Sequence, residues 1–152
     1  MNLKFTKLDL GKEQDVEFVA RIHCEAPGEW VADHSFTEES VKQTIERLKN
    51  IEKVHQAFLT RNADNKIVGF HWVQLESRPE TTVGHVLSLW VHPDYRKKGV
   101  ATRLKTQAES WMRSKGVSEV RTQVYLENQK MMALNNKLGF ETVMVGMSKK
   151  LV

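Results

Sequence analysis

The stretch that decides the fold reads Val86-Leu87-Ser88-Leu89-Trp90-Val91-His92-Pro93-Asp94-Tyr95-Arg96-Lys97-Lys98-Gly99-Val100-Ala101. Residues 86–91 form a nearly unbroken apolar run, which predicts a strand buried on both faces, because a half-exposed strand alternates apolar with polar residues. Pro93 ends this strand. Beyond Gly99, apolar residues recur at the spacing of an amphipathic helix, namely at Val100, Leu104, Ala108, Trp111 and Met112. We therefore predict a strand, a basic turn and a helix in direct succession.

The basic turn suits an anionic ligand. The first N–H groups of a helix have no partner within the helix, and the helix dipole is positive at that end. Gly99 lets a diphosphate approach the main chain closely, and Arg96, Lys97 and Lys98 add positive charge around it. The turn lacks the GxxxxGKS/T of a nucleotide P-loop and the GxGxxG of a dinucleotide fold. A solvated basic loop that caps an ordinary helix is the alternative interpretation.

Two ordered motifs carry a resemblance to a known family. Residues 89–101 resemble motif A of the GNAT N-acetyltransferase superfamily, which reads R/Q-x-x-G-x-G/A after a strand that ends V-x-P-x-Y/F. Further along the chain, the segment Asn128-Gln129-Lys130-Met131-Met132-Ala133-Leu134-Asn135-Asn136-Lys137-Leu138-Gly139-Phe140 is similar to the family's N-x-x-A-x-x-L-Y-x-K-L-G-F. The motifs cover about the last half of the chain, and the order of elements before them is compatible with the family.

The resemblance implies an α/β fold of the α+β type in a single domain over residues 1–152. It implies a mixed, largely antiparallel central sheet of about six or seven strands, flanked by about four helices. The strand that ends near Val91 is expected to splay from the strand that begins near Val120. The resemblance also implies acetyl-CoA as co-substrate, with its pantetheine arm in that cleft. The residues expected to bind it are Leu89, Trp90, Val91, Arg96, Lys97, Lys98, Gly99, Val100, Ala101, Thr102 and Asn128.

The implied reaction is direct transfer of an acetyl group from acetyl-CoA to a primary amine of a small molecule or protein in a ternary complex. The family commonly protonates the leaving thiolate from a tyrosine, and the matching position here holds Asn135, which cannot deliver a proton at neutral pH. A catalytic glutamate of some members is matched by Gln123. Tyr125 and His85 are candidate substitutes for these groups. Protons could also be relayed by water, or the thiolate could leave without a proton donor. The alternative function is a non-catalytic acyl-CoA-binding or sensor domain.

Composition narrows the partners. The net charge of +4 is small, and a polyphosphate ligand at the Arg96 turn explains it as well as nucleic acid does, so no nucleic-acid partner is predicted. No apolar run approaches the about 20 residues of a membrane span, and the first residues do not open a signal peptide, so a cytoplasmic location is expected. The single Cys24 excludes a disulfide within the chain, and the histidine spacing predicts no metal site.

The rest of the chain is predicted from periodicity and turn residues. Strands are expected over residues 3–8, 54–60, 67–75 and 120–126, and helices over residues 15–24, 37–48 and 129–138. We expect Thr37 and Asn128 to cap helices, and the last helix to bury Met131, Leu134 and Leu138. Residues 140–145 and 147–152 are expected to form a final hairpin. Several acidic residues lie near the presumed acceptor side, namely Glu25, Glu29, Asp33, Glu38 and Glu39. They favour a cationic amine as acceptor; the alternative is that they are only solvated surface residues. Members of the family often form dimers, so a homodimer is a candidate assembly.

Overall fold

The computed structural model describes residues 2–152. Within them, the strands are β1 (Lys4–Lys7), β2 (His55–Arg61), β3 (Ile67–Ser77), β4 (Thr82–Val91) and β5 (Glu119–Arg121). The α-helices are α1 (Glu13–Glu25), α2 (Glu38–Lys49), α3 (Val100–Ser114) and α4 (Gln129–Lys137). Two short 3-10 helices, η1 (Ala26–Glu29) and η2 (Pro93–Tyr95), follow α1 and β4. No helix in this part of the chain has the length and apolar content that a membrane crossing needs.

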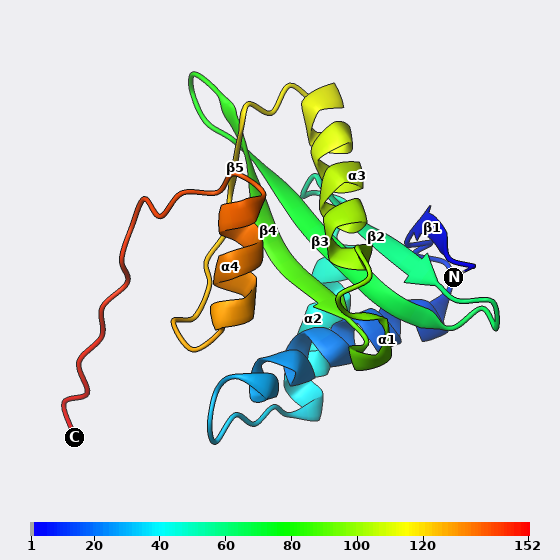
Figure 1. The fold of residues 1–152 in the computed structure, drawn as a ribbon, viewed down its shortest axis with the longest axis horizontal. Helices are drawn as coiled ribbons and strands as arrows, with labels where there is room; N and C mark the ends of the chain where they lie inside the picture. The colour runs from blue at the N-terminus through cyan, green and yellow to red at the C-terminus, as the bar shows by residue number, and fades with distance from the viewer. Residues whose placement is uncertain (1) are drawn as a thin grey trace.

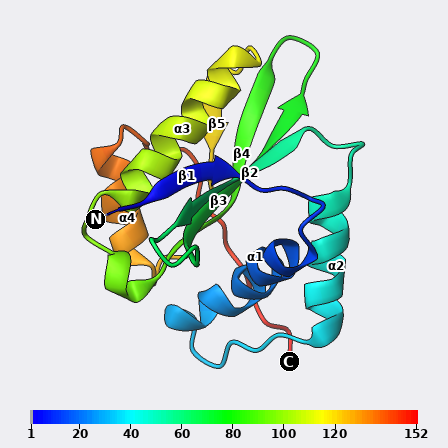
Figure 2. The same cartoon turned by 90° about the vertical axis from the view of Figure 1, so that its right-hand side faces the viewer.

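The strands form one sheet in chain order, β1-β2-β3-β4-β5. Neighbouring strands are antiparallel except β4 and β5, which run parallel. Helices α1 and α2 lie on one face of the sheet, while α3 and α4 lie on the other (Figure 1, Figure 2). The predicted α+β class and the mixed, largely antiparallel sheet are confirmed.

The two faces of the sheet bury two separate cores, because successive strand residues point to opposite sides. On β3, Phe70 and Trp72 pack in the core under α1 and α2. Val73 belongs to the other core, under α3, together with Leu104 and Met112. The central strand pair thus holds both helical layers in place.

The predicted helix caps are confirmed. Thr37 and Ser40 form a reciprocal capping box at the start of α2, with both N–H···O distances at 3.1 Å. Asn128 accepts a hydrogen bond from the Met131 N–H at 3.2 Å and so caps α4. Each cap satisfies a backbone donor that the helix itself leaves without a partner.

Strand β4 is less buried than its apolar run suggested. Residues 85–90 are half-buried rather than buried. Strand β5 pairs with Val83, Gly84 and His85 and then ends, so the rest of β4 has no neighbour on that side. The apolar run therefore belongs to a strand that has a partner on only one side over most of its length. Periodicity alone does not distinguish such a strand from a fully buried one.

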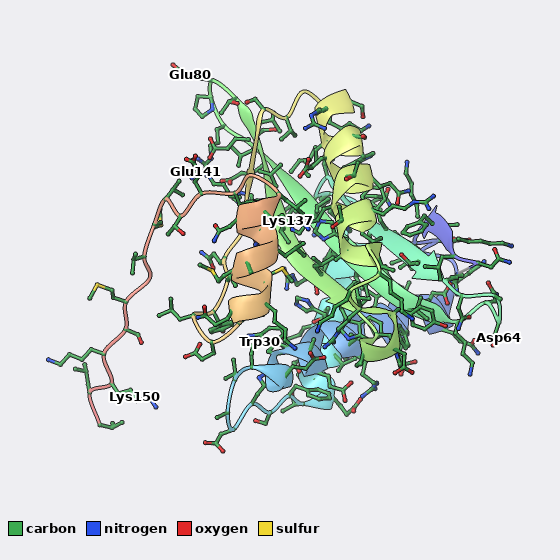
Figure 3. The ribbon with its side chains drawn as sticks, viewed as in Figure 1. Trp30, Asp64, Glu80, Lys137, Glu141 and Lys150 are labelled. Carbon is green, nitrogen blue, oxygen red and sulfur yellow. The ribbon has the colours of Figure 1, made fainter. Side chains whose placement is uncertain are left out.

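The C-terminal part of the chain differs most from expectation. The predicted strand over residues 120–126 shortens to Glu119–Arg121, and the sheet described here has five strands rather than six or seven. Residues 141–152, which we call the C-terminal segment, form neither a helix nor a strand, so the predicted final hairpin is wrong. The segment runs away from the rest of the molecule, as Figure 1 and the positions of Glu141 and Lys150 in Figure 3 show.

Helix α4 buries its polar Asn135 better than its apolar residues. Met131, Leu134 and Leu138 are half-buried, whereas Asn135 is only 5% exposed. The expectation that this helix buries those three apolar side chains is therefore wrong. Its apolar side has nothing from the C-terminal segment packed over it, since that segment is exposed throughout.

Candidate active site

The centre of the candidate site is the opening between β4 and β5. The two strands pair from Val83 with Glu119 to His85 with Arg121, and the pairing stops there. Strand β4 continues to Val91 with its main chain unpaired on that side. Leu89 and Val91 belong to the core under α3, whereas Trp90 packs against Phe70 in the other core. The predicted splay is confirmed, and it exposes main-chain groups of the residues expected to hold pantetheine.

The basic turn between β4 and α3 has the backbone of an anion cradle. Lys97 has φ 60° and Gly99 has φ 81°, so the chain twice adopts the left-handed conformation before the helix. In the described residues no side chain caps α3, which leaves the N–H groups of its first turn free for a ligand. A Cβ at Gly99 would meet no described atom within 4 Å. Val100, Ala101 and Thr102 form that first turn beneath the open space.

Arg96 and Lys98, two of the basic side chains of the turn, differ in what they contact. Arg96 donates from Nε to the Val91 carbonyl at 2.7 Å and from a terminal nitrogen to Glu29 at 2.8 Å. Lys98 lies over the Tyr95 ring, with Nζ 5.8 Å from its centre. Arg96 therefore links η1 to the end of β4 by hydrogen bonds. The spacing of residues in the sequence did not reveal this link.

The acidic residues of the α1–α2 region are partly neutralised. Glu29 is paired with Arg96, and Glu38 forms a 2.9 Å ion pair with Arg21. The hydrogen bond from Arg21 lowers the pKa of Glu38. These pairs leave Glu25, Asp33 and Glu39 to give this region its negative charge.

Asn128 and Asn135 lie at the start and near the end of α4. Asn128 caps the first turn of the helix, and its side-chain oxygen is thereby engaged. The Asn135 side chain is buried, and its Oδ1 has no hydrogen-bond partner among the described residues. A buried amide oxygen without a donor is costly, so this position favours a ligand that brings an N–H group.

Tyr125 and His85 lie apart from one another. Tyr125 is 61% exposed in the connection between β5 and α4. His85 lies on β4 at its last pairing with β5, and its Nε2 is 2.6 Å from Glu76 Oε2. That hydrogen bond is the main cause of the lowered pKa of Glu76, and Arg78 adds to it.

Lys105 was missed in the sequence. It lies in the second turn of α3, is 3% exposed, and places Nζ 5.0 Å from the centre of the Phe140 ring. Burial lowers the pKa of Lys105 to about 8, and Glu109 opposes that shift. The available signal was its position between Ala101 and Ala108 on the stripe of α3 that faces the protein.

His71 lies beneath α3 in the same core as Lys105. Its side chain is buried, and Nδ1 is 3.0 Å from the Ser88 carbonyl oxygen of β4. Burial and then the charge of Lys105 lower the pKa of His71 to about 3. The imidazole is therefore neutral at physiological pH, and Lys105 carries the positive charge of this core.

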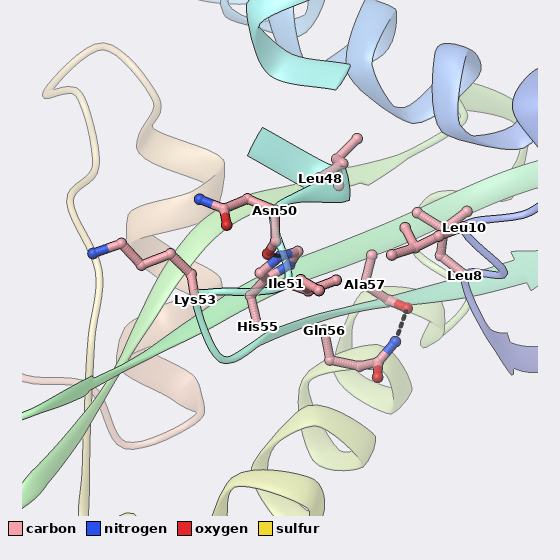
Figure 4. Close-up of a pocket in the computed structure, with 9 residues that line it drawn as sticks. All are labelled: Leu8, Leu10, Leu48, Asn50, Ile51, Lys53, His55, Gln56 and Ala57. Atoms are coloured by element: carbon pink, nitrogen blue, oxygen red, sulfur yellow. Dashed lines mark hydrogen bonds between the residues drawn. The ribbon is translucent and has the colours of Figure 1, made fainter. Parts of the chain in front are cut away.

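Two surface hollows lie away from the opening. Figure 4 shows one, lined by Leu8, Leu48 and His55 at the junction of β2 with the end of α2. A larger one, of about 540 Å³, lies between α1 and the β2–β3 turn and is lined by Phe18, Arg61 and Tyr95. Within residues 2–152, no three His, Cys, Asp or Glu side chains gather closely enough to hold a metal ion.

Comparison with known proteins decides the family. Residues 16–140 match the model of the acetyltransferase (GNAT) family. The chain belongs to that family. Its architecture agrees with this GNAT assignment: an aminoglycoside acetyltransferase from an uncultured soil metagenomic sample superposes with a TM-score of 0.77 at 16% identity, covering 100% of both chains.

Curated relatives of this GNAT chain carry names that give different compounds. A mycothiol acetyltransferase of Saccharomonospora viridis is 34% identical over 94 residues, which is 57% of this chain and 30% of that protein. An aminoglycoside N(6')-acetyltransferase type 1 of Acinetobacter genomosp. 13 is 38% identical over 69 residues, which is 45% of this chain and 47% of that protein. The chain thus spans less than half the length of these relatives.

Acetyl-CoA, the co-substrate typical of the GNAT family, fits the residues present. The unpaired N–H groups at the start of α3 and the open space over Gly99 suit a diphosphate. The open edge of β4 offers main-chain partners to an extended amide chain such as pantetheine. The buried Asn135 Oδ1, which has no partner among the described residues, is an acceptor that an amide N–H would satisfy.

Proposed function

We propose that this chain transfers the acetyl group of acetyl-CoA to a primary amine of a small molecule or protein, by direct attack in a ternary complex. The observation that carries the proposal is the continuity of the β4–β5 opening with the uncapped start of α3. The opening offers main-chain hydrogen-bonding groups to the extended pantetheine chain of CoA. The start of α3 suits the diphosphate, which follows pantetheine in CoA. We also place the reaction in the cytoplasm, because acetyl-CoA is an intracellular metabolite.

The acceptor we favour is a cationic amine. The relatives' names mention mycothiol and aminoglycosides, and an aminoglycoside carries amino groups. In this chain, Glu25, Asp33 and Glu39 give the α1–α2 region negative charge, which attracts a protonated amine. The amine must lose a proton before its nitrogen attacks the thioester.

The proton for the leaving thiolate comes, in this proposal, from Lys105. The acceptor nitrogen attacks the thioester carbonyl carbon, the C–S bond breaks, and the thiolate takes a proton from the Lys105 ammonium. The acceptor nitrogen releases one proton to water, and Lys105 regains one from water. Phe140, under the Lys105 Nζ, donates its N–H to the Asn135 carbonyl at 2.9 Å, so Lys105 lies beside the turn of α4 where the family's tyrosine would be.

The acidity of Lys105 suits this step. Its pKa of about 8 lies close to the about 8.5 of an ordinary thiol, and efficient proton transfer needs such a match. The charge that acts on Lys105 is that of Glu109 on α3, while His71 on β3 is neutral, and Asn135 and Phe140 on the α4 side are uncharged. Asn135 then orients the thioester by hydrogen bonding, and Tyr125 and His85 stand as alternative proton carriers.

Replacing Lys105 tests the proton route. Lys105→Met should lower kcat by about 100-fold at pH 7 and abolish the decline in kcat above about pH 8. It should also raise the free energy of unfolding at pH 7 by about 3 kcal/mol, because a buried ammonium is removed. Lys105→Arg keeps the charge and should also be slow. An unchanged pH profile in Lys105→Met would assign proton delivery to another group and leave the transferase proposal intact.

The second candidate function is a non-catalytic acyl-CoA-binding or sensor domain. Asn135 and Gln123 favour it, since neither can titrate where the family commonly uses a tyrosine and a glutamate. A sensor would bind acetyl-CoA without releasing free CoA at any pH.

Release of free CoA thiol from acetyl-CoA separates the two functions. The assay takes amino acids, polyamines, aminoglycosides and peptides in turn, with enzyme-free controls, after calorimetry has established acetyl-CoA binding. Release that depends on the acceptor supports the transferase and identifies the acceptor class. Binding with no release from any acceptor supports the sensor.

A further inference from the structure

Lys105 is the one lysine that is buried among residues 2–152, and no carboxylate in that part of the chain forms an ion pair with it. Its side chain is 3% exposed, and its Nζ lies 5.0 Å from the centre of the Phe140 ring. Glu109, one turn further along α3, forms its ion pair with Arg113 instead. A buried ammonium without a counter-ion is costly, so this position favours a change that removes the positive charge.

The surroundings of Lys105 suit an acetylated lysine better than a charged one. Asn135 Oδ1 is buried and has no hydrogen-bond partner among the described residues. It belongs to the turn of α4 that Phe140 closes by donating its N–H to the Asn135 carbonyl at 2.9 Å. N-acetyl-lysine is uncharged, carries an amide N–H that can donate to such an oxygen, and ends in an apolar methyl group. Acetylation would therefore remove the buried charge and supply a donor at the same time.

Burial also makes the Lys105 side chain a better nucleophile. Only a neutral amine attacks a thioester, and burial lowers the pKa of Lys105 to about 8, a shift that Glu109 opposes. His71 on β3 is neutral, and the residues of the α4 side, Asn135 and Phe140, are uncharged. At pH 8 about half of the Lys105 side chains are therefore neutral, against about 0.4% for a lysine with the ordinary pKa of about 10.4.

We propose that Lys105 is a self-acetylation site, which takes the acetyl group from bound acetyl-CoA when no acceptor amine is present. The inference rests on the proposed function, which places the thioester sulfur beside Lys105. The neutral Nζ bonds to the thioester carbonyl carbon, the C–S bond breaks, and one amine proton passes to the thiolate, which leaves as CoA thiol. The product is a stable amide without a proton to donate. Transfer to other amines should then slow by about 100-fold, as in Lys105→Met.

Mass spectrometry of the full chain, incubated with acetyl-CoA in an amine-free buffer, tests the proposal. We expect a single acetyl group per chain, located on Lys105 by peptide mapping, at a rate that saturates with acetyl-CoA. From pH 7 to pH 8.5 this rate should rise about eightfold and then level off, as the neutral fraction of a group with a pKa of about 8 does. An exposed lysine that reacts with acetyl-CoA from solution should instead show a rise of about 30-fold.

Two variants and a second reagent provide the controls. Lys105→Arg keeps the positive charge without a nucleophilic amine, and it should lose the acetyl group. Lys137→Arg alters an exposed lysine of α4 and should leave the acetylation of Lys105 unchanged. Acetyl phosphate, which lacks the CoA portion, should label exposed lysines and leave Lys105 unmodified.

The outcomes separate this inference from the proposed function. A chain that binds acetyl-CoA in calorimetry but carries no acetyl group on Lys105 overturns self-acetylation and leaves the transferase proposal intact. Acetylation of Lys105 by acetyl phosphate at the same rate would also overturn it, because the bound co-substrate would then have no part in the reaction. A chain that does not bind acetyl-CoA overturns the proposed function, and this inference with it.

Discussion

The chain before η2 and the chain after α3 differ in how completely they are packed. In the earlier part, Trp72, Phe58 and Phe70 are at most 1% exposed, and α2 has a complete capping box. In the later part, β5 spans three residues, α4 is half-covered, and residues 141–152 contact nothing that shields them. The difference teaches that the earlier part and α3 together form a closely packed scaffold, whereas the later part leaves groups open beside the β4–β5 opening, where we propose that the ligand binds.

Removing the largest buried side chain should break the scaffold. Trp72 is 1% exposed, and its Nε1 donates to His55 Nδ1 at 3.1 Å. Trp72→Ala should lower the free energy of unfolding by about 3–5 kcal/mol, through lost packing and an unpaired imidazole. Tyr125→Ala, in the open part, should change it by less than about 0.5 kcal/mol. Denaturant unfolding measures both, and equal losses would erase the distinction between the two parts.

Acid should destabilise the same scaffold through the buried His71 and the half-buried His23. Burial, with Arg47 nearby, lowers the pKa of His23 to about 4, and burial with Lys105 lowers that of His71 to about 3. Below about pH 6.5 both imidazoles are protonated in the unfolded chain but remain neutral in the folded chain. The free energy of unfolding therefore decreases as the pH is lowered. From pH 7 to pH 5 the loss should be about 2 kcal/mol for each histidine, about 4 kcal/mol in all.

The control for the acid effect is His23→Gln. This variant lacks one of the two titrating groups and should lose only about half as much stability over the same pH range. Denaturant unfolding at pH 7, 6 and 5 gives the comparison. A variant with the full pH dependence would mean that other groups cause the acid sensitivity.

Substitutions at two glycines, one at the proposed ligand site and one away from it, test the role of the turn in acetyl-CoA binding. Gly99 and Gly116 lie at opposite ends of α3, with φ 81° and 83°, and a Cβ at either meets no described atom within 4 Å. Gly99→Glu should weaken acetyl-CoA binding by at least about 100-fold, since it brings a negative charge to the diphosphate. Gly116→Glu imposes similar backbone strain, about 1–2 kcal/mol, and should leave affinity unchanged in calorimetry. Equal affinity in both variants would remove the turn from the site.

The smallest expected change in stability comes from removing either of two helix caps. Thr37→Ala removes the α2 capping box and should cost about 1 kcal/mol of stability, with no change in acetyl-CoA affinity. Asn128→Ala removes the α4 cap at a similar cost, and it should also weaken acetyl-CoA binding, because Asn128 is among the expected cofactor residues. If Asn128→Ala affected stability alone, its role would be limited to capping.

Sequence reasoning succeeded where the structure depends on neighbours along the chain. The caps at Thr37 and Asn128 and the helix that begins after Gly99 depend on a few adjacent residues, whose chemistry is visible in order. It failed where the outcome depends on distant partners. The half-burial of β4 follows from where β5 stops, and the acidity of Lys105 follows from its burial beside Phe140. The final hairpin was predicted around Gly146, but a turn residue does not by itself supply the sheet and the packed face that a hairpin needs.

The order of the strands also sets the order in which the molecule is made. Each of β2, β3 and β4 pairs with the strand synthesised just before or after it, so most of the sheet consists of short-range contacts that form early. During translation, the sheet as far as β4 is able to form before α4 and residues 141–152 have left the ribosome. Residues 141–152 therefore leave the ribosome when the strands as far as β4 are already able to pair, so whatever this segment packs against, it meets a sheet that is largely formed.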